Sequence, residues 1–87
     1  MKFTLSKQAQ AELLNAYDYY GRVSSPQLAD RLLEELNRVS QRLLRFPALG
    51  TPDTTSAKEI RWVTLRNFPY SVYYRAKADT IEILVFA

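Results

Sequence analysis

With 87 residues, 47% of them hydrophobic and 13% aromatic, the chain is long enough for one small packed domain spanning residues 1–87 and too apolar to be disordered. It contains no cysteine and no histidine, which excludes disulfides and thiolate chemistry and makes a zinc or iron site unexpected. The net charge of +3, with eight of the 12 basic residues being arginine, favours an acidic partner, although an ordinary basic surface has the same composition.

Membrane and export signals are missing from the sequence. No stretch approaches the roughly 20 apolar residues of a membrane span, and the first residues lack the apolar core of a signal peptide. We therefore expect a cytoplasmic protein that contacts no membrane. No metal or other cofactor is expected either.

The N-terminal part of the chain predicts a short strand followed by a helix. Lys2–Leu5 is expected to be the strand, and Ser6 is placed to cap a helix over Lys7–Tyr20, whose apolar residues recur three or four positions apart. Gly21 follows the last of these residues, at a position where a left-handed C-cap is common.

A second helix is indicated by Ser25-Pro26, which has the favoured order of a capping hydroxyl and a first-turn proline. Its apolar stripe runs to Phe46-Pro47, which ends the helix. Because the link between the two helices is short, we expect an antiparallel hairpin. A loop rich in turn-forming residues should follow, from Ala48 to Ala57.

The last thirty residues change from helical to alternating periodicity. They predict three strands, Glu59–Arg66, Tyr70–Ala76 and Thr80–Phe86, whose short connections make an antiparallel meander. The expected fold class is therefore α+β, with an N-terminal strand, a helix hairpin and a three-stranded meander that has both helices on one sheet face.

Alternation along these strands separates two faces of the sheet. The more aliphatic face should pack on the helices, and it consists of Val63, Leu65, Tyr70, Val72, Tyr74, Ile81, Ile83 and Val85. The other face combines aromatic side chains with arginines, a composition typical of protein-interaction surfaces. It consists of Trp62, Thr64, Arg66, Ser71, Tyr73, Arg75, Glu82, Leu84 and Phe86. The alternative is that the C-terminal end or a second copy of the chain covers this face.

The order of elements, from about Phe3 to Ala87, resembles the RelE/ParE superfamily of toxins from toxin–antitoxin systems. Two passages carry the resemblance. Arg42–Gly50 is similar to the family's L…P…G passage, and Glu59–Arg75 is similar to the ParE-type run of an arginine, the letters FPY and a following tyrosine. The chain is closer to the ParE branch than to the nuclease branch.

The resemblance implies a toxin that a cognate antitoxin masks, in a higher-order toxin–antitoxin complex. ParE-like members inhibit DNA gyrase without a hydrolytic site of their own, whereas RelE-like members cleave mRNA on the ribosome. Trp62, Thr64 and Ser71 stand where the nuclease branch has lysines and an arginine, so gyrase is the expected target and no catalytic residue is expected. The ribosome, with Tyr73 or Tyr74 acting as a base, is the alternative target.

The antitoxin or the target is expected to bind the exposed aromatic face, and a helix of the antitoxin could also use the groove beside the helix hairpin. The binding residues predicted are Trp62, Arg66, Tyr73, Arg75, Leu84 and Phe86.

Arg61 matches the arginine of the ParE-type run, and we expect it to be structural, bracing the helix hairpin with Glu12 or Asp18 as its partner. ParE-like sequences usually continue into a basic segment, whereas this sequence ends on Ile83–Ala87. A module that binds an antitoxin without being toxic is therefore a third hypothesis.

Overall fold

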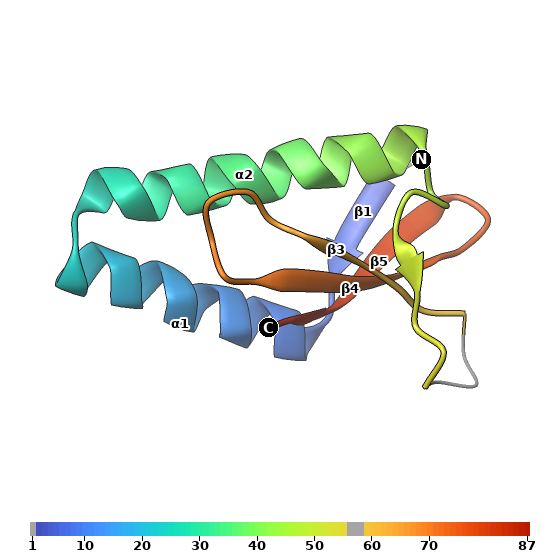
Figure 1. Cartoon of the computed structure of the whole chain (residues 1–87), viewed down its shortest axis with the longest axis horizontal. Coiled ribbons are helices and arrows are strands. Elements are labelled where there is room, and N and C mark those ends of the chain that lie inside the picture. The colour runs from blue at the N-terminus through green and yellow to red at the C-terminus, as the bar shows by residue number, and fades with distance from the viewer. Residues whose placement is uncertain (1, 56–58) are drawn as a thin grey trace.

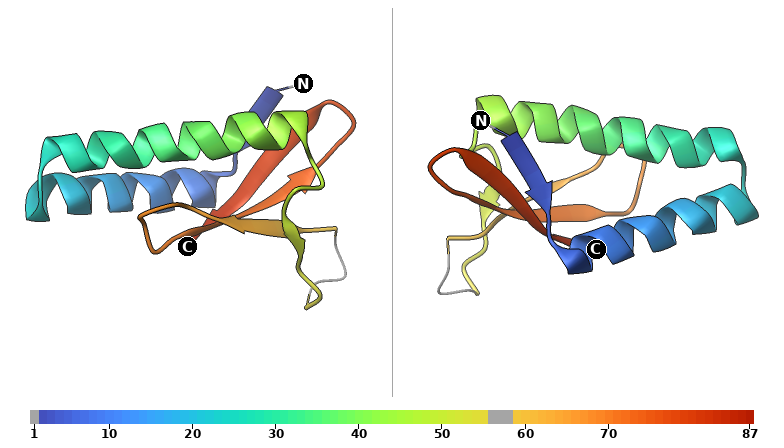
Figure 2. Two further views of the ribbon diagram at one scale, coloured as in Figure 1. Left: turned by 45° about the horizontal axis from the view of Figure 1, so that its top comes forward. Right: turned by 180° about the vertical axis from the view of Figure 1, so that it is seen from behind.

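Both helices lie on one face of a five-stranded mixed sheet in the computed structural model, which describes residues 2–55 and 59–87 (Figure 1). The expected α+β fold class is confirmed, and the two helices leave the reverse face of the sheet uncovered (Figure 2). In chain order the elements are β1 (Lys2–Leu5), α1 (Lys7–Val23), α2 (Pro26–Arg45), β2 (Thr51–Pro52), β3 (Arg61–Thr64), β4 (Ser71–Ala76) and β5 (Thr80–Phe86).

Each helix begins at a serine cap, as the sequence predicts. The Ser6 hydroxyl accepts the Ala9 N–H at 3.0 Å and donates to the Leu84 carbonyl at 2.7 Å, so this cap also holds α1 on β5. The Ser25 hydroxyl accepts the Leu28 N–H at 3.1 Å, with a proline in the first turn of α2. A cap of this kind stabilises a helix by about 1 kcal/mol.

The first helix does not end at Tyr20, and the prediction of Gly21 as a left-handed C-cap is wrong. α1 continues to Val23, because the Ser24 N–H still donates to the Tyr20 carbonyl at 3.0 Å. Gly21 therefore keeps a helical backbone with negative φ. A methyl group added to it would lie 4.0 Å from the Ala29 side chain, which is an ordinary contact.

The C-terminal meander of β3, β4 and β5 is antiparallel, as predicted, and a strand is added at each of its edges. β1 pairs in parallel with β5, and β2 pairs antiparallel with β3, with Thr51 opposite Trp62. β2 lies inside Ala48–Ala57, which was expected to be a loop, so that expectation is wrong at Thr51–Pro52. A strand of 2 residues is too short to show alternation in a sequence. Residues 56 and 57 lie outside the described residues.

The core fills the space between the helix hairpin and the sheet. Five residues predicted to face the helices are buried there, namely Leu65, Val72, Tyr74, Ile81 and Ile83. Burial of one such side chain contributes about 1.5–3 kcal/mol to folding. The rest of the buried cluster is Ala9, Ala16, Leu32, Leu36, Val39, Leu43 and Phe86. Within the described residues, neither helix is both long and apolar enough to cross a membrane.

A β-bulge at Leu84 reverses the alternation near the end of β5. Tyr74 pairs with Ile83 whereas Tyr73 pairs with Val85, so Leu84 is the extra residue on β5. Residues that lie opposite each other on paired strands point to the same face. Val85 therefore shares the face of Tyr73, away from the helices, and the prediction that it packs on them is wrong.

Phe86 points into the core, with only 2% of its surface exposed, so the prediction that it binds a partner from the exposed face is wrong. Its ring stacks on Tyr70 with centroids 4.7 Å apart, and its N–H donates to Glu12 Oε1 at 3.1 Å. The simple alternation of the sequence failed here because it allows for no extra residue in a strand.

Candidate functional site

The reverse face of the sheet, which we call the open face, carries a row of large apolar side chains. Trp62 on β3 lies opposite Tyr73 on β4, and Tyr73 lies opposite Val85 on β5. Each of the three is half-buried, although both helices lie on the other side of the sheet (Figure 2). The row is therefore partly exposed apolar surface on the side of the sheet away from the helices.

A charged pair lies beside this row, toward the turn between β4 and β5. Arg75 Nη2 is 2.7 Å from Glu82 Oε1, and Lys77 Nζ is 3.8 Å from the same oxygen. The hydrogen bond from Arg75, helped by the charge of Lys77, holds the pKa of Glu82 below its usual value against the opposing effect of burial. The guanidinium of Arg75 thus already has a carboxylate partner.

The structure brings some of the predicted binding residues together on the open face, but not all of them. Trp62, Tyr73 and Arg75 share that face, and Leu84, the half-buried bulge residue, lies between Ile83 and Val85 on β5. Arg66 lies apart from them, in the turn between β3 and β4, where it lines a hollow of about 400 Å³ against α2.

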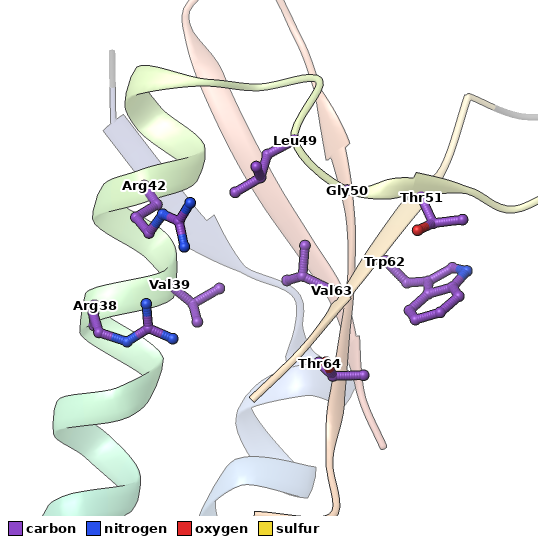
Figure 3. Close-up of a pocket in the computed structure, with 9 residues that line it drawn as sticks. All are labelled: Arg38, Val39, Arg42, Leu49, Gly50, Thr51, Trp62, Val63 and Thr64. Atoms are coloured by element: carbon purple, nitrogen blue, oxygen red, sulfur yellow. The ribbon is translucent and has the colours of Figure 1, made fainter. Parts of the chain in front are cut away.

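A groove of about 280 Å³ between α2 and the outer edge of β3 is a second surface, which the sequence prediction missed (Figure 3). Arg38 and Arg42 project from α2 toward β3, beside Val39 and across the groove from Val63. The remaining lining residues are Leu49, Gly50, Thr51, Trp62 and Thr64. The two arginines are four residues apart, which puts them on one face of a helix, and this spacing could have indicated the site.

The upper end of this groove is the loop after α2, which the buried Tyr74 holds in place. The Tyr74 hydroxyl donates to the Pro47 carbonyl at 2.7 Å and accepts the Gly50 N–H at 2.8 Å. Burial raises the pKa of Tyr74, although the Gly50 N–H acts in the other direction. A methyl group on Gly50 would lie 2.7 Å from the Tyr74 ring and 2.9 Å from the Trp62 carbonyl, so only glycine fits. This contact gives the glycine of the L…P…G passage a physical reason.

Arg61 supports the same loop. Its Nη1 donates to the Gly50 carbonyl at 2.9 Å and lies 3.5 Å from the Ala48 carbonyl. The expectation of Glu12 or Asp18 as its carboxylate partner is wrong, because the Arg61 guanidinium donates to carbonyl groups and Glu12 accepts the Phe86 N–H instead. Arg61 therefore braces the loop after α2 against β3 through carbonyl groups.

Glu35 joins the turn between β3 and β4 to α2. Its carboxylate accepts hydrogen bonds from Nε and Nη2 of Arg38 and from the Arg66 N–H, each at 2.7 Å. The hydrogen bonds from Arg38 hold the pKa of Glu35 below its usual value, with burial opposing and the Arg66 N–H assisting. One carboxylate thus bridges a helix arginine and the backbone of the turn between β3 and β4.

A third surface is an apolar hollow of about 470 Å³ on the helix hairpin. Its lining includes Leu14 and Leu33, which are 59% and 41% exposed. It is one of the hollows beside the hairpin, where an antitoxin helix was expected to bind, and the groove between α2 and β3 is another. That binding remains a prediction.

The structure places the groups that were considered for catalysis. Among residues 2–55 and 59–87, no group of three or more His, Cys, Asp or Glu is placed to hold a metal ion. The Tyr74 hydroxyl, one of the two candidate bases, is buried and occupied by the loop after α2. Tyr73 lies on the open face between apolar neighbours.

Comparison with known proteins identifies the family. The family model described as the ParE toxin of the type II toxin–antitoxin system parDE matches residues 3–87. A solved structure of the chromosomal ParDE toxin–antitoxin system from P. aeruginosa has the same fold, with a TM-score of 0.80 over 99% of this chain and 92% of that chain, at 24% identity. No curated protein has a significant sequence match to the chain. The chain therefore belongs to the ParE toxin family of type II toxin–antitoxin systems.

Proposed function

We propose that this ParE-family toxin inhibits DNA gyrase by binding it through the open face, and that a cognate antitoxin neutralises it. The observation that carries the proposal is the row of Trp62, Tyr73 and Val85, which is apolar surface on the side of the sheet away from both helices. Buried aromatic anchors with charged neighbours dominate the energy of many protein interfaces. Such a surface supports an inhibitor that works by binding.

The chemistry of the open face supports gyrase over the ribosome as the target. Metal-free RNA cleavage requires a base, an acid and positive charge on the phosphate. Thr64 and Ser71, which lie opposite each other on β3 and β4, are neutral residues at positions where the nuclease branch is basic. Arg75 is the arginine that remains on this face, and Glu82 already binds it.

A gyrase assay tests the proposed target directly. The full chain is incubated with purified gyrase, ATP and relaxed plasmid, and the reaction is then treated with detergent and protease. The proposal expects reduced supercoiling and an accumulation of linear plasmid, which marks trapped cleavage complexes. Unchanged gyrase activity, together with mRNA cleavage on translating ribosomes, would assign the chain to the nuclease class instead.

The second part of the proposal is an antitoxin that covers the apolar surfaces of the toxin. Its flexible segment would lie over the open face, over the hollow beside Leu14 and Leu33, or over both, in a higher-order complex. Both partners would act in the cytoplasm, where gyrase works. Co-expression with the protein encoded by the neighbouring gene should restore growth and gyrase activity, and continued killing by the co-expressed pair would contradict this part.

A further inference from the structure

The outer edge of β3 is almost fully occupied within the protein itself. The Leu65 N–H donates to the Tyr70 carbonyl of the β4 side at 3.0 Å. In an antiparallel pair the backbone groups of successive residues point to opposite edges. The N–H and C=O groups of Trp62, Thr64 and Arg66 therefore point away from β4, toward β2 and α2.

Two of these three residues have partners inside the chain. Trp62 lies opposite Thr51 of β2, and the Arg66 N–H is taken by the Glu35 carboxylate at 2.7 Å. β2 begins at Thr51, and the Leu49 N–H turns back to the Phe46 carbonyl at 3.0 Å instead of continuing the ladder.

Thr64 is the residue left over. In the described part of the chain no strand lies opposite it on this side, so its N–H and C=O face the groove between α2 and β3. An unpaired strand edge of this kind is a template for another chain.

Glu35 shows which group fits between α2 and the backbone that directly follows β3. Its carboxylate bridges the Arg38 guanidinium and the Arg66 N–H. One helical turn further along α2 is Arg42, and two residues back along β3 is Thr64. Arg42 also lines the groove and points toward β3 (Figure 3). Among the described residues, Arg42 has no carboxylate within ion-pair distance.

We propose that the groove binds a carboxylate side chain from an acidic, extended segment of a partner protein, between the Arg42 guanidinium and the Thr64 N–H. The antitoxin is the partner in question, so this identification rests on the proposed function. Hydrogen bonds from charged or backbone donors to a carboxylate are among the stronger ones in proteins. The bound carboxylate repeats, one turn along α2, the bridge that Glu35 makes.

The surroundings of this site favour a peptide over DNA. The Thr64 carbonyl faces the same groove and can accept a hydrogen bond, which a peptide N–H donates and the phosphate backbone of DNA does not. Val39, Val63 and Leu49 line the groove beside the arginines and can receive an apolar side chain next to the acidic one. Alternating acidic and apolar residues are the pattern of an extended segment with two different faces.

The experiment is an NMR titration of the isotope-labelled full chain. The probe is a blocked peptide of alternating valine and glutamate, and its control is the same peptide with glutamine. We expect the glutamate peptide to shift the Thr64 amide and the Arg42 Nε resonances and to bind at least about tenfold more tightly than the glutamine peptide. Equal binding of the two peptides would overturn the proposal.

Two pairs of matched variants locate the carboxylate. Arg42→Gln should weaken binding of the glutamate peptide about tenfold, whereas Arg45→Gln, which removes the same charge outside the groove, should change it less than about twofold. Thr64→Pro removes the N–H at an edge position that tolerates proline and should also weaken binding about tenfold. Thr64→Val keeps the N–H and should bind as the unaltered chain does.

Three further results would overturn the site. Equal losses of peptide affinity in Arg42→Gln and Arg45→Gln would mean that binding depends only on general positive charge. Equal affinities of Thr64→Pro and Thr64→Val would mean that the Thr64 N–H does not bind the carboxylate. Tighter binding of a single-stranded DNA oligonucleotide at the same resonances would assign the groove to nucleic acid. The titration involves no gyrase. If the chain binds the peptide but does not inhibit gyrase, the carboxylate site stands and only gyrase as the target is contradicted.

Discussion

The two faces of β3, β4 and β5 belong to the same strands but differ in how far their side chains are buried and hydrogen-bonded. On the helix side, the Tyr74 hydroxyl has both a donor and an acceptor within 2.8 Å, and its ring is fully buried. On the open face, its sequence neighbour Tyr73 is half-buried between Trp62 and Val85. The two adjacent tyrosines thus have different roles. The buried Tyr74 stabilises the fold, whereas the half-buried Tyr73 leaves apolar surface to which a partner can bind.

The largest effect on the helix side is expected from its glycine. Gly50→Ala should lower the free energy of unfolding by about 2–3 kcal/mol, because the new methyl group would meet the Tyr74 ring and the Trp62 carbonyl at less than 3.0 Å. Gly21→Ala is the matched control. It adds a methyl group within α1 with ordinary space around it and should raise stability by about 0.5–1 kcal/mol. Urea unfolding of both variants checks the opposite signs, and a destabilised Gly21→Ala would contradict this account of α1.

The open face is tested by removing its aromatic anchors. Trp62→Ala and Tyr73→Ala should each weaken antitoxin binding by about 2 kcal/mol or more, because interface aromatics carry a large share of binding energy. Both residues are half-buried, so the variants should remain folded. Calorimetry with the purified antitoxin measures the loss, and Arg45→Ala serves as a control away from this face. Unchanged affinity in both variants would remove the open face from the antitoxin interface.

The helix order, the caps and the strand periodicity could be predicted because they depend on local physics. Ser6 and Ser25 cap helices through neighbouring N–H groups, and alternation correctly places Val72 and Tyr74 in the core. Phe86 could not be placed, because the bulge at Leu84 depends on how β5 pairs with β4 rather than on either sequence alone.

The groove between α2 and β3 shows the same limit for the candidate site. The spacing of Arg38 and Arg42 was visible in the sequence, but their neighbour Thr64 lies on a strand that is remote along the chain. In the sequence, Gly50 is recognisable only as a turn former. The need for glycine at this position comes from the Tyr74 ring, which leaves no room for a side chain. Local patterns therefore predicted the elements, while contacts between distant segments decided the site.

A smaller effect separates the two adjacent tyrosines. Tyr74→Phe should lower the free energy of unfolding by about 1–3 kcal/mol, because the Pro47 carbonyl and the Gly50 N–H would both lose their buried partner. Tyr73→Phe should change stability by less than about 0.5 kcal/mol, since it alters a partly exposed surface position. Thermal or urea unfolding compares the two. Equal effects would show that the Tyr74 hydroxyl does not hold the loop after α2.

The smallest effect expected is the contribution of Glu35, and it depends on pH. The pKa of Glu35 is lowered in the folded state, chiefly by hydrogen bonds from Arg38, so its ionised form stabilises the fold. This stabilisation is complete above about pH 5 and is lost as the pH falls through the folded-state pKa. At pH 7, Glu35→Gln should lower the free energy of unfolding by about 1 kcal/mol, and the difference from the unaltered chain should shrink as the pH falls through the folded-state pKa of Glu35. Glu34→Gln, at the exposed neighbouring position, is the control for the removal of one negative charge. A difference that stays constant with pH would mean that Glu35 stabilises the turn by packing, and the bridge from Arg38 to the Arg66 N–H would then be a poor guide to what the groove beside Arg42 binds.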